Sequence, residues 1–459
     1  MHRPLNIYSL FVSIRSTAIA ISVVILVSST LAASNEQVLY SFQGGSDGYN
    51  PSEALLADSA GNLYGTTVEG GTGGSCGYDK NGCGTVFQLS PPAQSGGPWV
   101  ETVLYRFTGG SDGYWPTAAL VADKNGNLYS TTSAGGVNDN GTIFELQRPS
   151  TPGGAWTYRL LYAFQGVPGG KGDGDGSLPN GVVFDAAGNL YGTTNGGGFC
   201  TEFEGLVNCN GSVFELAAPS DPGGAWTESV LFRFGESGDS FSNPHGDVVF
   251  DKKGNLYGTT YVGGAFAGGV FELMPPSAPG DAWREKTLDN FDSTDGGGPN
   301  GTLVFDGAGN LYGTTVIGGA ANVGAVFELS PPASPSGAWT ETVLYSFQSF
   351  QSTYDGNSPL GNVIFDKSGN LFSTAWMGGT FNRGTVLQLT PSSNRGEWIE
   401  TTLHDFGSGN DGQEPDGGLI WGQDGGLYGT ATEGGLGPSE QCKLDGYAWS
   451  CGVVFRIEP

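Results

Sequence analysis

The sequence predicts an all-β protein, and three observations carry that prediction. The 459-residue chain contains 81 glycines and 25 prolines, a composition typical of many short strands joined by tight turns. Aromatic residues make up 12% of the chain and charged residues only 14%, whereas disordered chains are poor in aromatics and rich in charge. Short runs of Val, Leu, Phe, Tyr and Thr recur between Gly, Pro, Asn and Asp, and no helical periodicity persists beyond the N-terminal segment.

The N-terminal segment has the pattern of a secretory signal peptide. Arg3 and Arg15 precede an apolar stretch at residues 17–31, and small residues stand at its end, at Thr30, Ala32 and Ala33. The apolar core is short for a membrane span, and an uncleaved anchor is the competing interpretation. We therefore expect residues 1–33 to be a signal peptide and residues 34–459 to form one secreted domain without a membrane span.

Seven repeats fill the rest of the chain. Gly-Asn-Leu-Tyr or a near copy recurs about every 55–66 residues, and a period in this range is typical of propellers, solenoids and arrays. The copies begin at Gly61, Gly126, Gly188, Gly254, Gly309, Gly369 and Gly425. Each repeat holds four strand-like runs, which in the third repeat are residues 181–185, 190–194, 212–216 and 226–234.

The two ends of the repeat array predict a closed ring. The seventh repeat ends after its third strand, at residues 453–457, whereas a strand of the fourth type stands alone at residues 36–42. If these two strands pair, no long edge stays exposed. We therefore predict a seven-bladed β-propeller of four-stranded blades, closed by the N-terminal strand completing the last blade. An open solenoid would need polar capping repeats, which neither end resembles.

The repeat unit also resembles a known family. It combines Leu-Tyr-x-Phe, Asp-Gly-x-x-Pro, Asp-x-x-Gly-Asn-Leu-Tyr-Gly-Thr-Thr, Gly-Gly and Gly-Thr-Val-Phe-Glu-Leu. In this it is similar to the GloVer tandem repeat of exported bacterial "choice-of-anchor" proteins, over nearly all of residues 36–459. The resemblance implies export and a propeller-like fold, and it supplies no catalytic residues. Members of that family often carry a C-terminal sorting segment, and the lack of one after Ile457 favours release over anchoring.

Residues that recur from repeat to repeat are interpreted as scaffold. In six repeats an Asp stands three residues before the Gly of the Gly-Asn-Leu turn, where its carboxylate can accept backbone N–H bonds. These residues are Asp58, Asp123, Asp185, Asp251, Asp306 and Asp366. A Trp opens the fourth strand in six repeats and a Phe lies in the third strand in six, which predicts packing between blades.

Departures from the repeat indicate where a functional surface would lie. Because adjacent strands alternate in direction, the loops between second and third strands share one face with the connections between repeats. We call this the loop face. Loops between second and third strands have 8 residues in four repeats, but 16 at residues 68–83, 16 at 195–210 and 20 at 432–451. Long loops on a rigid scaffold usually carry binding.

All six cysteines lie in these three long loops, two in each. Six cysteines allow fifteen pairings, and their placement favours a bond within each loop. Zinc ligation is the minor alternative, because no Cys-x-x-Cys or neighbouring His accompanies them. We predict the disulfides Cys76–Cys83, Cys200–Cys209 and Cys442–Cys451, and no metal site at the cysteines.

The loop face is also acidic. The connections between repeats carry Asp-Gly turns, in which Asp47 and Asp411 either form the turn or contribute to a ring of carboxylates. Repeats seven and one, which are neighbours in a closed ring, add acids that do not recur in the other repeats. We therefore place a candidate ligand site over this seam, with these residues as its members: Glu53, Glu69, Asp416, Glu433, Asp47 and Asp411.

Two of these acids occupy the same position of the repeat. Glu69 and Glu433 each stand just before a Gly-Gly pair, where other repeats have Ala, Asn, Val, Ile or Met. Two carboxylates brought together could hold Ca²⁺ through their oxygens or act as an acid and a base on a sugar.

Charge and motifs limit the function classes. With 45 acidic and 18 basic residues the net charge is −27, which argues against nucleic acid or an anionic membrane as partner. No metalloprotease, phosphate-loop or dinucleotide-binding motif is present in its structural context. We predict a secreted, monomeric binding protein that engages an extracellular protein or glycan on the loop face. The alternative is an extracellular carbohydrate- or lactone-active enzyme that uses paired carboxylates, with Ca²⁺ as the one cofactor considered.

Overall fold

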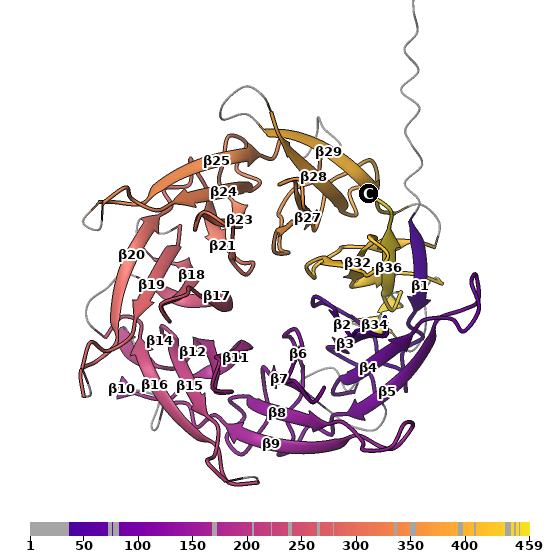
Figure 1. The fold of residues 1–459 in the computed structure, drawn as a ribbon, viewed down its shortest axis with the longest axis horizontal. Coiled ribbons are helices and arrows are strands. Elements are labelled where there is room, and N and C mark those ends of the chain that lie inside the picture. The colour runs from indigo at the N-terminus through magenta and orange to yellow at the C-terminus, as the bar shows by residue number, and fades with distance from the viewer. Residues whose placement is uncertain are drawn as a thin grey trace, which may run out of the picture. The chain divides into compact units, whose positions relative to one another are not determined.

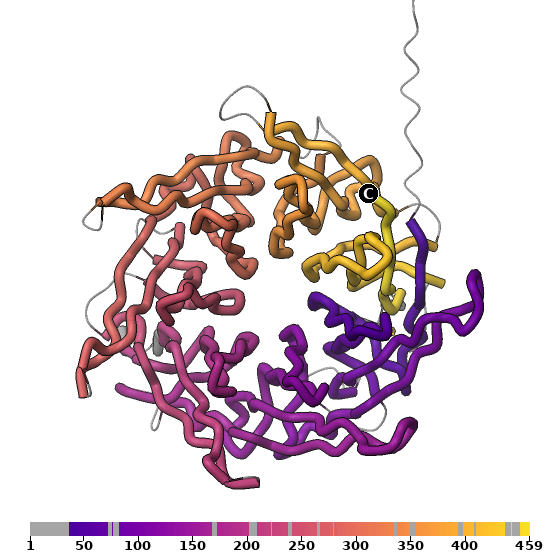
Figure 2. Tube along the Cα trace, viewed as in Figure 1, coloured from indigo at the N-terminus to yellow at the C-terminus, as the bar shows by residue number. Residues whose placement is uncertain are grey.

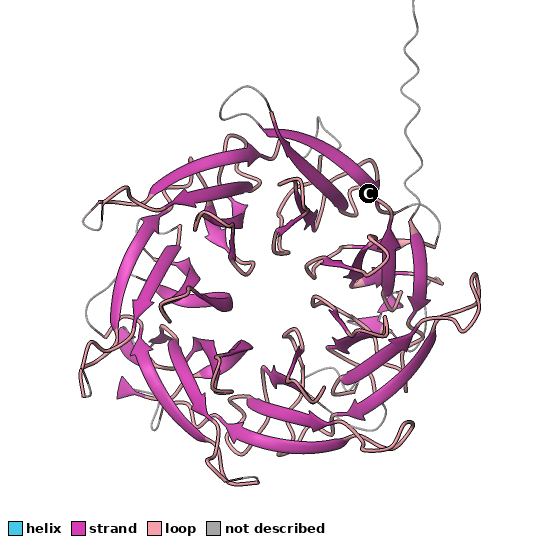
Figure 3. Cartoon of the chain, viewed as in Figure 1, coloured by secondary structure: helices cyan, strands magenta, loops and turns pink. Residues whose placement is uncertain are grey.

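A computed structural model gives the conformation of most of the chain after residue 35. It describes residues 36–71, 76, 82–167, 172–203, 206–221, 223–236, 241–263, 267–278, 280–334, 337–348, 355–392, 398–407, 410–436, 442–444, 447–448 and 450–459. The expected signal peptide, residues 1–33, lies outside the described residues. The described part contains strands and turns but no helix, and thus no helix with the length and apolar character to cross a membrane (Figure 3).

The strands form seven small antiparallel sheets arranged around a ring in the described part of the chain (Figure 1). This confirms the predicted seven-bladed β-propeller. Blades are numbered one to seven in the order of the repeats, and within each blade the strands follow one another from the ring axis outward. The three blades built from the first half of the chain are β2 (Leu56–Ala57), β3 (Leu63–Thr67), β4 (Thr85–Ser90) and β5 (Val100–Arg106); β6 (Val121–Ala122), β7 (Leu128–Thr132), β8 (Thr142–Gln147) and β9 (Thr157–Ala163); and β11 (Ser177–Phe184), β12 (Leu190–Gly196), β15 (Ser212–Ala217) and β16 (Thr227–Arg233).

The second half of the chain supplies the other four blades. They are β17 (Ser242–Phe250), β18 (Leu256–Val262), β19 (Gly269–Met274) and β20 (Arg284–Asn290); β21 (Gly297–Pro299) and β22 (Val304–Phe305) with β23 (Leu311–Ile317), β24 (Ala325–Ser330) and β25 (Thr340–Ser346); β26 (Ile364–Phe365), β27 (Leu371–Ala375), β28 (Thr385–Pro391) and β29 (Trp398–Asp405); and β31 (Ile420–Trp421), β32 (Leu427–Ala431), β36 (Val453–Ile457) and β1 (Gln37–Ser41). Short strands outside the blades are β10 (Gly172–Asp173), β13 (Phe199–Phe203), β14 (Leu206–Cys209), β30 (Gly412–Gln413), β33 (Glu433–Gly434), β34 (Lys443–Leu444) and β35 (Tyr447–Ala448).

The ring closes through its first and last strands, as predicted. β1 pairs antiparallel with β36, from Gln37 opposite Arg456 to Ser41 opposite Val453, with one shift of register between them. The tube trace shows the indigo start of the propeller beside its yellow end (Figure 2). Because β1 completes the sheet of blade seven, that blade gains the outer strand that its own repeat lacks.

The core lies between neighbouring blades. The third-strand Phe of one blade packs edge to face against the Phe that ends the outer strand of the preceding blade, and Phe42 and Phe87 illustrate this at 5.1 Å between ring centroids. Both rings are almost fully buried. Gly65 of the second strand makes room for this contact, because a Cβ there would lie 2.6 Å from the edge of the Phe87 ring. The recurring Phe is therefore packing, as the sequence predicted.

The recurring Asp residues form turns, also as predicted. Asp58 accepts hydrogen bonds from the backbone N–H of Ala60 at 2.8 Å and of Asn62 at 2.9 Å. Its second oxygen accepts from the Asn62 side chain at 2.8 Å. The same pattern recurs at Asp185 and Asp366. Their carboxylates accept hydrogen bonds within the turn that joins the first two strands of a blade.

A second device links each blade to the next. The residue before the recurring Pro adopts a left-handed conformation, and its N–H donates to a carbonyl at the end of the preceding blade's loop. Trp115, for example, has φ 56° and donates to Cys83 at 3.1 Å. Such a backbone costs about 1 kcal/mol or more for a residue other than Gly, so the ring must impose it. The residues concerned are Asn50, Trp115, Leu178, Asn243, Gly298, Ser358 and Glu414.

Threonines of the second strand add hydrogen bonds across the same seams. Thr131 donates to the carbonyl of Asn180 at 3.0 Å, and Thr374 donates to that of Gly417 at 3.2 Å. At the closing seam, Thr430 of blade seven donates to the Glu53 carbonyl of blade one at 2.9 Å. These bonds tie the innermost segment of one blade to the second strand of the preceding blade.

Candidate functional site

Each long loop is held by its own disulfide, which confirms the predicted pairing. The bonds are Cys76–Cys83, Cys200–Cys209 and Cys442–Cys451, and no cysteine is free. In the loop of blade three, Cys200 and Cys209 are also opposite one another in the hairpin of β13 and β14. Disulfides persist in oxidising compartments, so three of them indicate an oxidising, extracytoplasmic environment.

The Asp residues of the Asp-Gly turns are held by the outer strand. Asp47 accepts a hydrogen bond from the Tyr40 hydroxyl at 2.9 Å and another from the backbone N–H of Gln43 at 2.9 Å. Burial nevertheless raises the pKa of Asp47 above its ordinary value. Asp112 is held in the same way by Tyr105 at 2.9 Å. The Asp47 carboxylate therefore fixes the connection from blade seven to blade one.

Asp411 occupies the same position with a different partner. His404 replaces the usual Tyr, and its Nε2 lies 3.2 Å from Oδ2 of Asp411, with both side chains buried. The backbone N–H of Gly407 donates to the other oxygen at 3.0 Å. Asp411 thus also serves the turn.

Glu69 and Glu433 have the equivalent backbone positions that the sequence indicates, but their side chains have different partners. The buried Glu69 carboxylate accepts a hydrogen bond from the Tyr49 hydroxyl, and the two backbones pair as an isolated bridge. Glu433 lies in β33, and its Oε2 is 3.5 Å from Nη1 of Arg383. The contacts of the two glutamates therefore run to different blades: Glu69 to blade one and Glu433 to blade six.

Arg383 also contacts a second carboxylate. Its Nη1 lies 3.0 Å from Oε1 of Glu414, so one guanidinium joins Glu414 and Glu433. Both glutamate side chains are only about one fifth exposed, at 18% and 19%. Burial raises the pKa of Glu433 to about 7, the nearby Glu414 carboxylate adds to this, and Arg383 opposes it.

The acidic series continues toward the ring axis. Burial raises the pKa of Asp416 to about 6, and the charge of Glu414 adds to the rise. The pKa of Glu53 is raised well above its ordinary value, first by burial and then by Asp416 and Asp247. Glu53 is surrounded by protein but keeps partial access to solvent, so water moderates this shift. Four carboxyl groups thus influence one another in sequence, and we call Glu53, Glu414, Asp416 and Glu433 the acidic seam.

Asp247 and Arg383 were not expected from the sequence. Asp247 belongs to β17 of blade four, on the opposite side of the ring from blade one (Figure 1), and burial raises its pKa to about 6. Arg383 lies in the loop between β27 and β28 of blade six. Both were overlooked because their partners come from other repeats. The sequence marks such a residue only by its difference from the other repeats: Asp247, for example, stands where the third repeat has Gly181.

The described residues hold no preformed metal centre. Within that part of the chain, no group of three or more His, Cys, Asp or Glu side chains lies close enough to bind a metal ion. The expectation of Ca²⁺ at the seam thus stays a prediction. What the acidic seam offers as it stands is a row of carboxyl groups with a single guanidinium among them.

Comparisons with known proteins agree with the repeat. The model of the Gloeobacter/Verrucomicrobia repeat matches residues 24–203 and 199–440. No protein with a curated description matches the chain.

Solved structures match the chain only at low identity and with TM-scores below 0.5. A provisionally named 6-phosphogluconolactonase of Bacteroides uniformis is 15% identical, with a TM-score of 0.45, over 75% of this chain and 84% of its own. A protein of unknown function from Dyadobacter fermentans is 10% identical, with a TM-score of 0.40, over 92% and 98%. A luciferin-regenerating enzyme is 14% identical, with a TM-score of 0.40, over 74% and 90%. At these identities the likenesses say nothing about what this chain binds. The family match, in contrast, spans most of the chain, and the protein belongs to the Gloeobacter/Verrucomicrobia repeat family.

Proposed function

We propose that this chain is an exported binding protein, and that its acidic seam receives an ammonium group of an extracellular partner. The observation that carries the proposal is the imbalance of charge at the seam, where Arg383 is the one cation among the described residues that contacts the carboxylates of Glu414 and Glu433. A carboxyl group whose pKa is raised lacks compensation for its ionised form. A cationic ligand would supply that compensation.

The same imbalance determines how binding depends on pH. Glu433 and Asp416, with pKa values of about 7 and 6, lose their protons between pH 5 and 8. A lysine ammonium stays charged throughout this range. Affinity for the ammonium ligand should therefore rise with pH as the seam ionises, and it should fall with added salt.

A hydrolase that uses Glu69 and Glu433 as an acid and base pair is less well supported. The hydroxyl of Tyr49 holds Glu69, whereas Arg383 holds Glu433, so neither contact presents the two carboxyls to one substrate bond. The binding protein is accordingly the function that we put forward.

Calorimetric titration with tetralysine tests the proposal. We expect tetralysine to bind the mature protein more tightly at pH 8 than at pH 5, while tetralysine acetylated on its side chains binds much more weakly. The double variant Glu414→Gln, Glu433→Gln should lose about tenfold or more in affinity, since hydrogen bonds to charged groups contribute about 1.5–3 kcal/mol.

Two controls complete the test. Glu458→Gln removes an exposed carboxylate just after β36, at the end of that strand away from the loop that carries Glu433, and should leave affinity unchanged. A glucosamine tetramer that binds more tightly than tetralysine would identify an amino sugar, rather than a protein lysine, as the source of the ammonium group. Equal binding of the free and acetylated peptides, or of the double variant and the parent, would contradict the proposal.

A further inference from the structure

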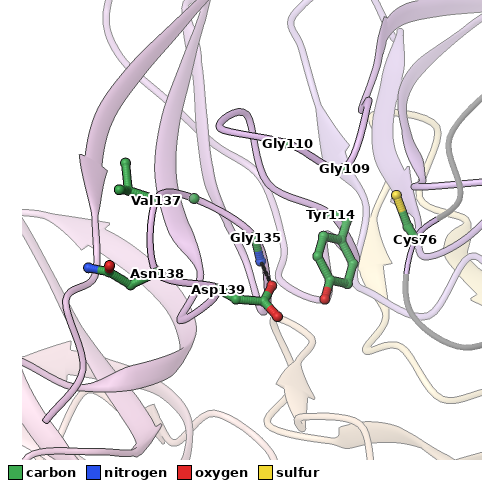
Figure 4. A pocket seen from close by; sticks show the side chains of 9 residues that line it. Cys76, Gly109, Gly110, Tyr114, Gly135, Val137, Asn138 and Asp139 are labelled. Carbon is green, nitrogen blue, oxygen red and sulfur yellow. Dashed lines mark hydrogen bonds between the residues drawn. The ribbon is translucent and has the colours of Figure 1, made fainter. Parts of the chain in front are cut away.

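A hollow of about 560 Å³ opens on the loop face where blades one and two meet (Figure 4). Its volume lies within the range of about 300–1,000 Å³ typical of small-molecule sites. Its lining includes Cys76, Gly109, Tyr114, Gly135, Asn138 and Asp139. They come from the stapled loop of blade one, from the connection between blades and from the short loop between β7 and β8. This hollow is separate from the acidic seam.

Glycines and the disulfide shape the hollow. Gly109 has φ 80°, and a Cβ there would lie 2.1 Å from the sulfur of Cys76. Gly135 has φ 84°, and its Cβ would lie 2.5 Å from the Cα of Gly113. Backbone and disulfide therefore form the walls at van der Waals contact, and the glycines contribute no side chain that could fill the space. A rigid, open site is the result.

The side chains that line the hollow, besides the disulfide sulfur, are those of Tyr114, Asn138 and Asp139 and the largely exposed Val137. The Tyr114 ring is steadied by an edge-to-face contact with Trp115, at 5.0 Å between centroids. Oδ1 of Asp139 accepts the backbone N–H of Gly135 at 2.9 Å, which leaves Oδ2 without a contact among the described residues. Asn138 donates to Gln165 at 2.8 Å through its amide nitrogen, so its amide oxygen is likewise an available acceptor.

We propose that this hollow binds a neutral saccharide. A sugar ring has an apolar C–H face, which can lie on the Tyr114 ring, and hydroxyls that donate to carboxylate and amide oxygens. The Asp139 carboxylate disfavours phosphate and sulfate ligands by charge repulsion. The lining residues include too few apolar side chains for a purely apolar ligand.

Other blades have different residues at the positions of Asp139 and Tyr114 and keep the same backbone conformation. Blades five and six have Asn322 and Asn382 where blade two has Asp139, and their amide oxygens accept the equivalent N–H at 3.0 and 3.2 Å. Blade six has Asn357 where blade two has Tyr114, with the same backbone bridge. Asp139→Asn and Tyr114→Asn are therefore substitutions that the fold already accommodates elsewhere.

The experiment uses the full mature chain with its disulfides intact. The probes are cellotetraose, xylotetraose, mannotetraose and a β-linked galactotetraose, titrated by calorimetry and by saturation-transfer NMR. We expect at least one of them to bind, and Asp139→Asn and Tyr114→Asn each to weaken that binding about tenfold. Asn382→Asp, the reverse change in blade six, is the matched control and should bind as the parent does.

Two further measurements separate this proposal from that of the acidic seam. Binding of the neutral sugar should survive Glu414→Gln with Glu433→Gln, and it should be lost on mild reduction, which opens Cys76–Cys83. The unfolding midpoint of each variant shows whether the fold is intact, and Asp139→Asn suffices if Tyr114→Asn does not fold. If none of the four sugars binds, or if Asp139→Asn binds them as well as the parent, the saccharide proposal is wrong.

Discussion

Five of the six glutamates that share one position at the outer strand should make the propeller lose stability as the pH rises from about 4.5 to 7. Burial raises the pKa of each to about 7. They are Glu36, Glu101, Glu228, Glu341 and Glu400. One oxygen of Glu101 is buried without a hydrogen-bond partner, and Asp47 nearby raises its pKa further. We expect Glu101 to be largely protonated in the folded protein at pH 6.

Stability falls with rising pH because the folded state binds the Glu101 proton more tightly than the unfolded state does. Glu101 has an ordinary pKa of 4.5 and a folded pKa of about 7, so the folded state retains a proton that the unfolded state releases. This residue therefore imposes no cost below pH 4.5, and it reduces stability progressively as the pH rises from about 4.5 to 7. A shift of that size corresponds to about 3 kcal/mol at most. Because Glu101 is only partly buried, solvent screening reduces the expected effect to about 1 kcal/mol.

Urea denaturation at pH 5 and pH 8, followed by tryptophan fluorescence, measures this effect. Glu101→Gln removes the titrating group and should lessen the loss of stability between the two pH values by about 1 kcal/mol. Blade two, with Tyr158 at the equivalent position, shows that a neutral residue is tolerated. The exposed Glu458→Gln should behave as the parent. An equal fall in stability for Glu101→Gln and the parent would refute the reasoning.

Two other predictions concern the loops and the closure. Mild reduction should loosen the stapled loops, each bond contributing about 2–3 kcal/mol, while far-ultraviolet circular dichroism of the ring stays unchanged. Global unfolding on reduction would show that the disulfides hold the blades. Deletion of residues 34–44 removes β1 and leaves β36 as an open edge, so we expect loss of cooperative unfolding and aggregation. A deletion variant that stays monomeric with the parent's unfolding midpoint would contradict closure by β1.

The fold was predictable because the repeat provides several copies of each signal. A lone Asp58 could be a catalyst or a turn residue, but the same Asp in six repeats favours the turn, and its backbone bonds confirm this. Closure was predictable for a related reason. The strand missing from repeat seven and the surplus strand at residues 36–42 can be counted in the sequence, and strand pairing leaves them one arrangement.

The candidate site was only partly predictable, because side-chain direction does not follow from repeat position. Glu69 and Glu433 occupy equivalent positions, yet Tyr49 draws one carboxylate inward and Arg383 of another blade holds the other. The approach of Asp247 to Glu53 depends on the diameter of the ring, which the spacing of repeats does not encode. The hollow beside Tyr114 was invisible for another reason: it is produced by the absence of side chains at Gly109 and Gly135.

The disulfides themselves indicate where binding should be sought. In blades one and seven, the residue that closes the stapled loop accepts an N–H from the next blade: Cys83 from Trp115 and Cys451 from Asn50, both at 3.1 Å. Blades without a staple make the same bond, as Asn140 does with Leu178 at 3.1 Å. The ring therefore does not need the staples. The staples instead order the loops that carry them. Glu433 of the acidic seam lies near the start of the stapled loop of blade seven, and Cys76 of the stapled loop of blade one lines the hollow. A loop that a disulfide already orders loses less conformational entropy when a ligand binds. Stapled loops beside the acidic seam and the hollow therefore favour ligand binding at both places.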